Sequence, residues 1–193
     1  MDKSGSGQKH GQTGNVYNSA TLTRSICIPM RTIASGLDSR INSILGSQLE
    51  GKCCADGFIQ PSSIKLISYS SGNIHEDVVE YQTVFECMIA NPVEGQVIAC
   101  VVENVTKAGI KCRIDMETSP LVVFVARDHH FMNTYFSSIT EGDHVMVKVI
   151  GQRYELNDPY ISVIATLIES KASNEHKKKH RQSKQPKIVL ETA

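Results

Sequence analysis

The chain has 193 residues, 40% of them hydrophobic, which excludes a fibrous or wholly disordered chain and suits one larger or two small globular domains. Basic and acidic residues both number 20, so the formal net charge is zero, but residues 171–193 hold seven of the bases and only two of the acids. The remaining residues, with 13 bases and 18 acids, form an acidic body. Such a body disfavours strong free-standing nucleic-acid binding, because phosphate contacts need clustered Lys and Arg.

Targeting signals and cysteine usage favour an intracellular protein. The sequence has no run of about 18 apolar residues that would span a membrane, and residues 1–20 lack the apolar centre of a secretion signal. The six cysteines form no CxxC pair. We expect them to act as small hydrophobes in a reducing compartment, with no bound metal and no cofactor.

The first segment of the chain is not expected to pack against the rest. Residues 1–19 are rich in Gly and Ser, lack hydrophobic periodicity and are predicted to form a flexible arm. Residues 21–30 then alternate between apolar and mostly small or polar side chains. This alternation predicts a first strand, which Pro29 ends because proline lacks a backbone donor.

A helix and two further strands are expected next. Residues 35–48 predict an amphipathic helix, with a capping-box-like start at Ser35 and a stop near Gly51. Residues 57–69 and 78–90 predict strands, the second in strict alternation. The order strand, helix, strand, strand indicates an α+β domain over residues 20–91, with its helix laid on an antiparallel sheet.

The second half changes character after Pro92. It shows no clear helical period but has five candidate strands, at 95–105, 109–114, 121–125, 144–150 and 160–167. Short strands separated by Gly, Pro, Asn and Asp leave no room for crossover helices and predict an antiparallel barrel or sandwich. A five-stranded, all-β barrel of the OB-fold type fits residues 92–170 best. Residues 171–193 are predicted to be a basic, disordered tail.

A family resemblance rests on four strings. Residues 92–114, PVEGQVIACVVENVTKAGIKCRI, resemble the opening of an S-one RNA-binding domain, an OB-fold barrel. The strings LEGKC at 49–53, GFI at 57–59 and YQTVFECMIANP at 81–92 resemble the first half of a family in which that barrel is the second domain. This family is the stalk subunit of multisubunit DNA-dependent RNA polymerases, the seventh subunit of eukaryotic polymerase II and its counterpart in archaeal enzymes. The resemblance covers residues 20–168, but excludes the arm and the tail.

The resemblance implies that the tip of the first domain docks on the core polymerase near its clamp, and that both domains bind a second, helical stalk subunit. The implied docking residues are Glu50, Gly51, Lys52, Gly57, Phe58 and Ile59. The two glycines would allow sharp backbone turns. Phe58 and Ile59 would offer an apolar anchor, and burying one such side chain contributes about 1.5–3 kcal/mol. The alternative is that both are core residues of the second strand.

Single-stranded nucleic acid crosses strands two and three of OB barrels, stacking on aromatics and meeting Lys or Arg. The RNA-binding candidates here are Lys111, Arg113, Phe124, Arg127, His129 and Lys148, with His130 and Phe131 nearby. Alternation predicts that Lys111 and Arg113 are exposed together, whereas we expect core burial for Phe124 and loop positions for the two histidines. Ile110 stands where RNA-binding barrels often place an aromatic. We therefore expect weak, salt-sensitive RNA binding.

No enzyme motif is present. The sequence lacks a P-loop, an HExxH helix, a GxSxG elbow and a dinucleotide-binding glycine fingerprint. The adjacent pair of histidines at 129 and 130 would point to opposite faces of an extended chain, so we expect no metal there. The tail could bind nucleic acid, direct nuclear import or simply aid solubility.

The sequence therefore predicts a non-catalytic stalk subunit of a DNA-directed RNA polymerase, with core subunits, a second stalk subunit and nascent RNA as partners. One alternative is a stand-alone OB-fold RNA-binding adaptor, such as a cap subunit of an RNA-degrading complex or a translation factor. Another is an interaction module whose barrel contacts no RNA. The expected location is with the transcription machinery, in the nucleus of a cellular host, or in the host cell or virion of a DNA virus.

Overall fold

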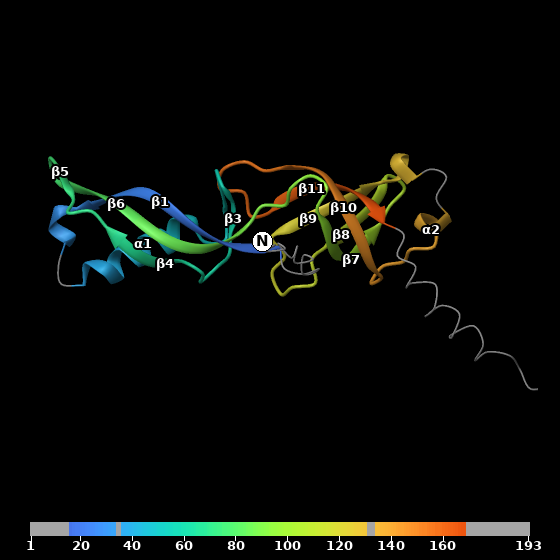
Figure 1. Cartoon of the computed structure of the whole chain (residues 1–193), viewed down its shortest axis with the longest axis horizontal. Coiled ribbons are helices and arrows are strands. Elements are labelled where there is room, and N and C mark those ends of the chain that lie inside the picture. The colour runs from blue at the N-terminus through green and yellow to red at the C-terminus, as the bar shows by residue number, and fades with distance from the viewer. Residues whose placement is uncertain (1–15, 34–35, 131–133, 169–193) are drawn as a thin grey trace, which may run out of the picture.

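Two β-rich regions lie next to each other along the long axis of the molecule (Figure 1). The computed structural model of the chain describes residues 16–33, 36–130 and 134–168. The first region is a six-stranded sheet with one longer helix, and the second is a closed barrel of five strands.

The sheet region is built on two long strands. Its elements are β1 (Tyr17–Pro29), η1 (Met30–Thr32), α1 (Leu37–Leu49), β2 (Cys53–Cys54), β3 (Gly57–Ile59), β4 (Lys65–Tyr69), β5 (Asn73–His75) and β6 (Val78–Ala90). The strands β1 and β6 pair antiparallel along their whole lengths, and β6 also pairs with β3, β4 and β5. As expected from the alternation, β6 buries every second side chain from Val79 to Ile89.

The helix α1 covers one face of this sheet. Its buried residues Ile41 and Leu45 share a core cluster with Ile26, Ile28 and Phe85 of the sheet. The other face is largely polar, as the exposed alternate positions of β1 show. The predicted helix is confirmed within two residues, and its predicted stop is confirmed because Gly51 has a φ of 71°. The predicted cap at Ser35 lies outside the described residues.

The predicted order strand, helix, strand, strand is too simple. The segment 57–69 forms two strands, β3 and β4, rather than one, and the short strands β2 and β5 were not predicted. These two strands have only two and three residues, which is too short for a period-two pattern to appear.

The barrel confirms the prediction of five strands. They are β7 (Val97–Val105), β8 (Gly109–Arg113), β9 (Leu121–Ala126), β10 (His144–Arg153) and β11 (Ile161–Ile168), and they close in the order β10-β11-β9-β8-β7. All neighbours are antiparallel except β9 and β11, which are parallel. The short helices η2 (Arg127–His130) and α2 (Thr134–Ser137), between β9 and β10, were not predicted.

The two regions share a core and several hydrogen bonds. Phe58 and Ala90 of the sheet belong to the same buried cluster as the barrel interior. The Cys53 N–H donates to the Asp158 carbonyl at 2.9 Å, and the Asn157 N–H donates to the Cys53 carbonyl at 2.8 Å. The short strand β2 is therefore bonded on one side to β3 and on the other to the β10–β11 loop.

The beginning of the described chain also belongs to this junction. Val16 and Tyr17 are each 5% exposed and pack in the barrel-side cluster. Residues 16–19 are therefore not part of a flexible arm, because β6 offers β1 a pairing partner as far as Tyr17. Residues 1–15 and the predicted tail 171–193 lie outside the described residues.

Candidate functional site

The six predicted docking residues lie in and directly before one hairpin, made of β2 and β3. The Gly51 N–H donates to the Ile59 carbonyl at 2.9 Å, and the Ile59 N–H donates to the Lys52 carbonyl at 3.1 Å. Before the hairpin, a Glu50 carboxylate oxygen accepts the Ile64 N–H at 3.1 Å. Gly57 has a φ of 132°, and a Cβ there would lie 2.5 Å from the Ala90 carbonyl oxygen. Glycine is therefore needed at this position for close strand packing.

Phe58 and Ile59 are not an exposed anchor, and that expectation is wrong. Phe58 is 1% exposed and Ile59 is 0% exposed. Successive residues of a strand point to opposite faces, and both faces of β3 are covered. Phe58 packs in the barrel-side cluster, whereas Ile59 packs in the cluster under α1. Both side chains hold the junction together, which is the core alternative considered from the sequence.

The exposed part of the hairpin is its turn, at Ala55 and Asp56. The Arg24 guanidinium of β1 contacts the Asp56 carboxylate at 2.7 Å, which ties the turn to the long strand. The Lys52 ammonium donates to the Ser47 carbonyl at 3.3 Å and is partly exposed. A docking role for residues 50–59 stays a prediction, in which the exposed turn and the half-buried residues 50–52 could contact a partner directly.

Three of the RNA-binding candidates lie together on the outer face of β8 and β9. Lys111 is directly opposite Phe124, and Arg113 is opposite Val122. The prediction that the two basic residues are exposed together is confirmed. The Lys111 ammonium, however, pairs with the Glu103 carboxylate at 2.8 Å, so much of its charge is already compensated.

The expected core burial of Phe124 is wrong. This side chain is 36% exposed, because the inward positions of β9 are taken by Val123 and Val125, both 0% exposed. Its ring lies over Gly109 of β8, where a Cβ would be 2.8 Å from the Phe124 Cζ atom. The Phe124 ring therefore covers Gly109, and its exposed side could still contact a ligand.

The candidates Arg127 and His129 belong to η2, beyond the end of β9, and not to this face. The Arg127 guanidinium donates to the Thr106 carbonyl at 3.0 Å and stacks over Phe136, with 5.2 Å from Cζ to the ring centroid. Its Nε atom is buried without a hydrogen-bond partner within the described part of the chain. Arg127 is thus engaged in the fold, while His129 is exposed. Phe131 lies outside the described residues.

His130 is a structural residue rather than a loop residue. It is 8% exposed, and its Nε2 atom accepts the Leu167 N–H at 3.1 Å, while its ring stacks on Phe136. Burial, and then the charge of His129, lower the pKa of His130. The neutral imidazole therefore fastens η2 to the last strand of the barrel.

Lys148 lies on β10, on the far side of β11 from Phe124. It is opposite Thr166 of β11 and opposite Val97 of β7. Sequence reasoning missed two exposed isoleucines in the same area, Ile150 and Ile164. The alternation of β11 and of β10 could have placed Ile164 and Ile150 outward. The β-bulge near Gly151, which brings Ile150 beside Ile164, leaves little signal in the sequence.

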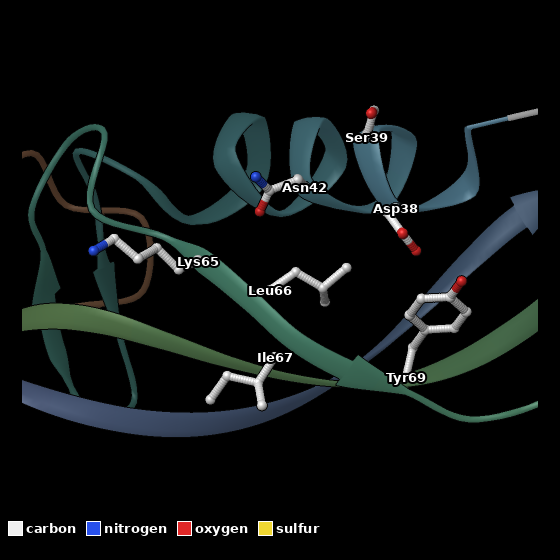
Figure 2. A pocket seen from close by; sticks show the side chains of 7 residues that line it. All are labelled: Asp38, Ser39, Asn42, Lys65, Leu66, Ile67 and Tyr69. Atoms are coloured by element: carbon white, nitrogen blue, oxygen red, sulfur yellow. The ribbon is translucent and has the colours of Figure 1, made fainter.

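A shallow groove of about 630 Å³ opens between α1 and β4 (Figure 2). It is lined by Asp38, Ser39, Asn42, Lys65, Leu66, Ile67 and Tyr69. The Tyr69 hydroxyl points toward the Asp38 carboxylate, and a hydrogen bond to that carboxylate raises the pKa of Tyr69.

Five of the six cysteines are buried. Burial raises the pKa of the Cys100 and Cys112 thiols to about 12 and that of Cys53 and Cys87 to about 11. They behave as small hydrophobes, as predicted, whereas Cys27 is exposed because β1 turns it to the polar face. Within residues 16–33, 36–130 and 134–168, no three His, Cys, Asp or Glu side chains gather as metal ligands, and no helix is long and apolar enough to cross a membrane.

Comparison with known proteins relates the chain to a viral protein. No family model matches the chain. The chain is 21% identical over 179 residues to a protein of Acanthamoeba polyphaga mimivirus named "Putative DNA-directed RNA polymerase subunit". The match covers 84% of this chain and 87% of the viral protein. The match and the closed five-stranded barrel both fit an RNA polymerase subunit.

Proposed function

We propose that the chain is a non-catalytic stalk subunit of a DNA-directed RNA polymerase. The observation that carries the proposal is the similarity to the viral polymerase protein, because it extends over most of both chains and so includes both the sheet region and the barrel. Support also comes from the four strings that resemble the stalk family. The barrel is of the OB type in this proposal, and the sheet region is the tip domain.

The mechanism proposed is binding. The sheet region docks on the core subunits through the β2–β3 hairpin, with Lys52 and the turn at Asp56 in contact and Phe58 supporting them from behind. Because β2 is bonded to the β10–β11 loop, a force on the hairpin passes directly to the barrel. A second, helical stalk subunit would bind alongside, and the barrel would lie near the emerging RNA.

The barrel's contact with RNA is weak in this proposal. Stacking contributes about 1–3 kcal/mol per base, and Phe124 is the aromatic on the outer face of β9 that could supply it. Of the two basic residues beside it, Lys111 is already paired with Glu103. RNA crosslinking should fall when Lys111→Glu and Arg113→Glu are combined, and should stay unchanged in Lys107→Glu, an exposed turn residue. Equal crosslinking in all three proteins would remove the RNA role.

The docking role is tested by purifying the tagged full-length chain from its native source at moderate salt, followed by mass spectrometry. We expect the two large polymerase subunits and one small helical partner. Phe58→Asp would not test docking, because a charge at a buried junction unfolds the protein. The suitable variant is Lys52→Glu, with Lys65→Glu on β4 as its exposed control.

Loss of the large subunits in Lys52→Glu, but not in Lys65→Glu, would support the docking surface. Recovery of nuclease or ribosomal subunits with every variant would instead favour a stand-alone RNA-binding adaptor. In that case the proposal of a polymerase subunit is wrong.

A further inference from the structure

Three exposed apolar side chains lie side by side across β9, β11 and β10. Phe124 is 36% exposed, Ile164 51% and Ile150 41%. Phe124 is directly opposite Ile164, and Ile164 is opposite Gly151 on its other side. We call Phe124, Ile164 and Ile150 the apolar row.

The β-bulge in β10 completes the apolar row. The register between β10 and β11 shifts between Val149 and Gly151, so Ile150 is the extra residue. In such a bulge two residues face one on the partner strand, and here Ile150 and Gly151 face Ile164. A Cβ on Gly151 would meet no atom within 4 Å, so the space beside Ile164 is open.

The barrel does not need these three side chains for its core. The inward positions next to them belong to Val123, Val163 and Val149, which are 0%, 1% and 1% exposed. Adjacent exposed apolar side chains that the core does not use, unlike singly scattered ones, can form an interaction site in soluble proteins. The three strands concerned lie together in the barrel (Figure 1).

Two cations stand at diagonally opposite corners of the apolar row. Lys148, on β10, is opposite Thr166 of β11. Thr166 is the next residue after Ile164 on the outer face of β11. Arg113, on β8, is opposite Val122 of β9. Val122 is the residue before Phe124 on the outer face of β9, so it lies toward the other end of the row. Within the described part of the chain Lys148 has no ion pair, and Arg113 has only a 3.5 Å contact with the Met116 carbonyl.

The other cations near the row are compensated. Lys111 pairs with Glu103 at 2.8 Å, and Arg153 contacts Glu155 at 3.4 Å. A nucleic-acid strand would therefore meet carboxylates between its cations. Within the apolar row it would find a single aromatic, since the other two members are isoleucines without a π face for base stacking.

We propose that the apolar row, with Lys148 and Arg113, is the docking surface for a partner protein segment that presents apolar side chains flanked by carboxylates. An apolar centre with a charged rim is the arrangement of protein interfaces, and two free cations at opposite corners select a partner with acids at both ends. The surface is separate from the β2–β3 hairpin, so this inference does not depend on docking to a polymerase. It shares Phe124 and Arg113 with the face proposed above to contact RNA, and a protein segment bound there would take the place of that RNA contact.

The test uses the tagged full-length chain with p-benzoylphenylalanine in place of Ile164, purified with whatever complex it forms and then irradiated. The control carries the same photo-crosslinker in place of Ala99, an exposed residue of β7. We expect a protein crosslink at position 164 at least tenfold above that at position 99. Mass spectrometry should locate it in a segment with Asp or Glu on both sides of apolar residues.

Charge reversal provides the second measurement. The combined variant Lys148→Glu and Arg113→Glu should lower the crosslink yield at position 164 at least tenfold, while Lys107→Glu should leave it unchanged. The proposal is overturned by a crosslink to RNA, a crosslink to a second copy of this chain, or a yield no higher than at position 99. A yield that charge reversal leaves unchanged also overturns it. The protein composition of the same sample reports independently whether polymerase subunits are present.

Discussion

The sheet region and the barrel offer a partner different things. Strand β1 pairs with β6 along one edge, and no strand among the described residues pairs with its other edge. A free edge leaves backbone donors and acceptors available for pairing. The barrel closes on itself and has no free edge. A partner can therefore pair with the backbone of the sheet, but it can recognise the barrel only through side chains. The residues on the outer face of the barrel therefore decide which partner the barrel binds.

The largest effect on stability is expected at the junction between the two regions. Phe58→Ala should lower the free energy of unfolding by about 3–5 kcal/mol, because it empties a fully buried aromatic site. The matched control is Phe124→Ala, which removes the same side chain from a position that is 36% exposed. It should cost clearly less in urea unfolding. Equal losses would mean that Phe58 is not part of a shared core.

The next largest loss of stability is expected where β8 and β9 pack closely in the barrel. A Cβ on Gly109 would lie 2.3 Å from the Val125 carbonyl oxygen, so Gly109→Ala forces the paired strands apart. We expect a loss of about 1–3 kcal/mol, as for overpacked cores. Gly151→Ala is the control, because its Cβ meets no atom within 4 Å. Thermal unfolding should separate the two variants, and similar melting temperatures would contradict the described pairing of β8 and β9.

Polar contacts across the junction should have a smaller effect. The Gln152 side-chain amide donates to the Asn91 side-chain oxygen at 2.6 Å. Gln152→Ala should cost about 0.5–1.5 kcal/mol, as for a typical hydrogen bond, and should speed hydrogen exchange at the Cys53 amide. Arg153→Ala, at an exposed neighbouring position, is the control. Unchanged exchange at Cys53 in Gln152→Ala would show that this contact does not hold the regions together.

The smallest effect concerns pH and the barrel alone. Because the pKa of His130 is lowered from its ordinary value of 6.5 in the folded state, protonation favours unfolding. Its contribution to stability is fully present above pH 6.5 and decreases as the pH falls below that value. The melting temperature should fall less between pH 6.5 and 5.5 in His130→Asn than in the parent protein. If His129→Asn reduced the pH dependence of the melting temperature by the same amount, the assignment of this dependence to His130 would be wrong.

Periodicity predicted most of the fold. The strict alternation of residues 78–90 fixed both the limits and the buried face of β6, and the five barrel strands were located within a few residues. The division of the chain into domains at residues 91 and 92 stays a prediction. Short elements such as β2 and β5 escaped because two or three residues carry no period.

The candidate site was less predictable, because exposure depends on what covers a strand. Alternation correctly placed Lys111 and Arg113 outward. It could not show that Phe58 faces the barrel and Ile59 faces α1, since that requires the packing of two regions distant in sequence. For Phe124 the aromatic residue type favours burial, but its position between two inward-facing valines of β9 turns it outward.

The most direct test of the polymerase proposal is electron cryo-microscopy of the complex that co-purifies with the tagged full-length chain. We expect the chain on the outer surface of the two large polymerase subunits, with the β2–β3 hairpin in the contact and the catalytic centre elsewhere. A complex without the large polymerase subunits, or one in which a nuclease or ribosomal assembly holds the barrel, would contradict the account.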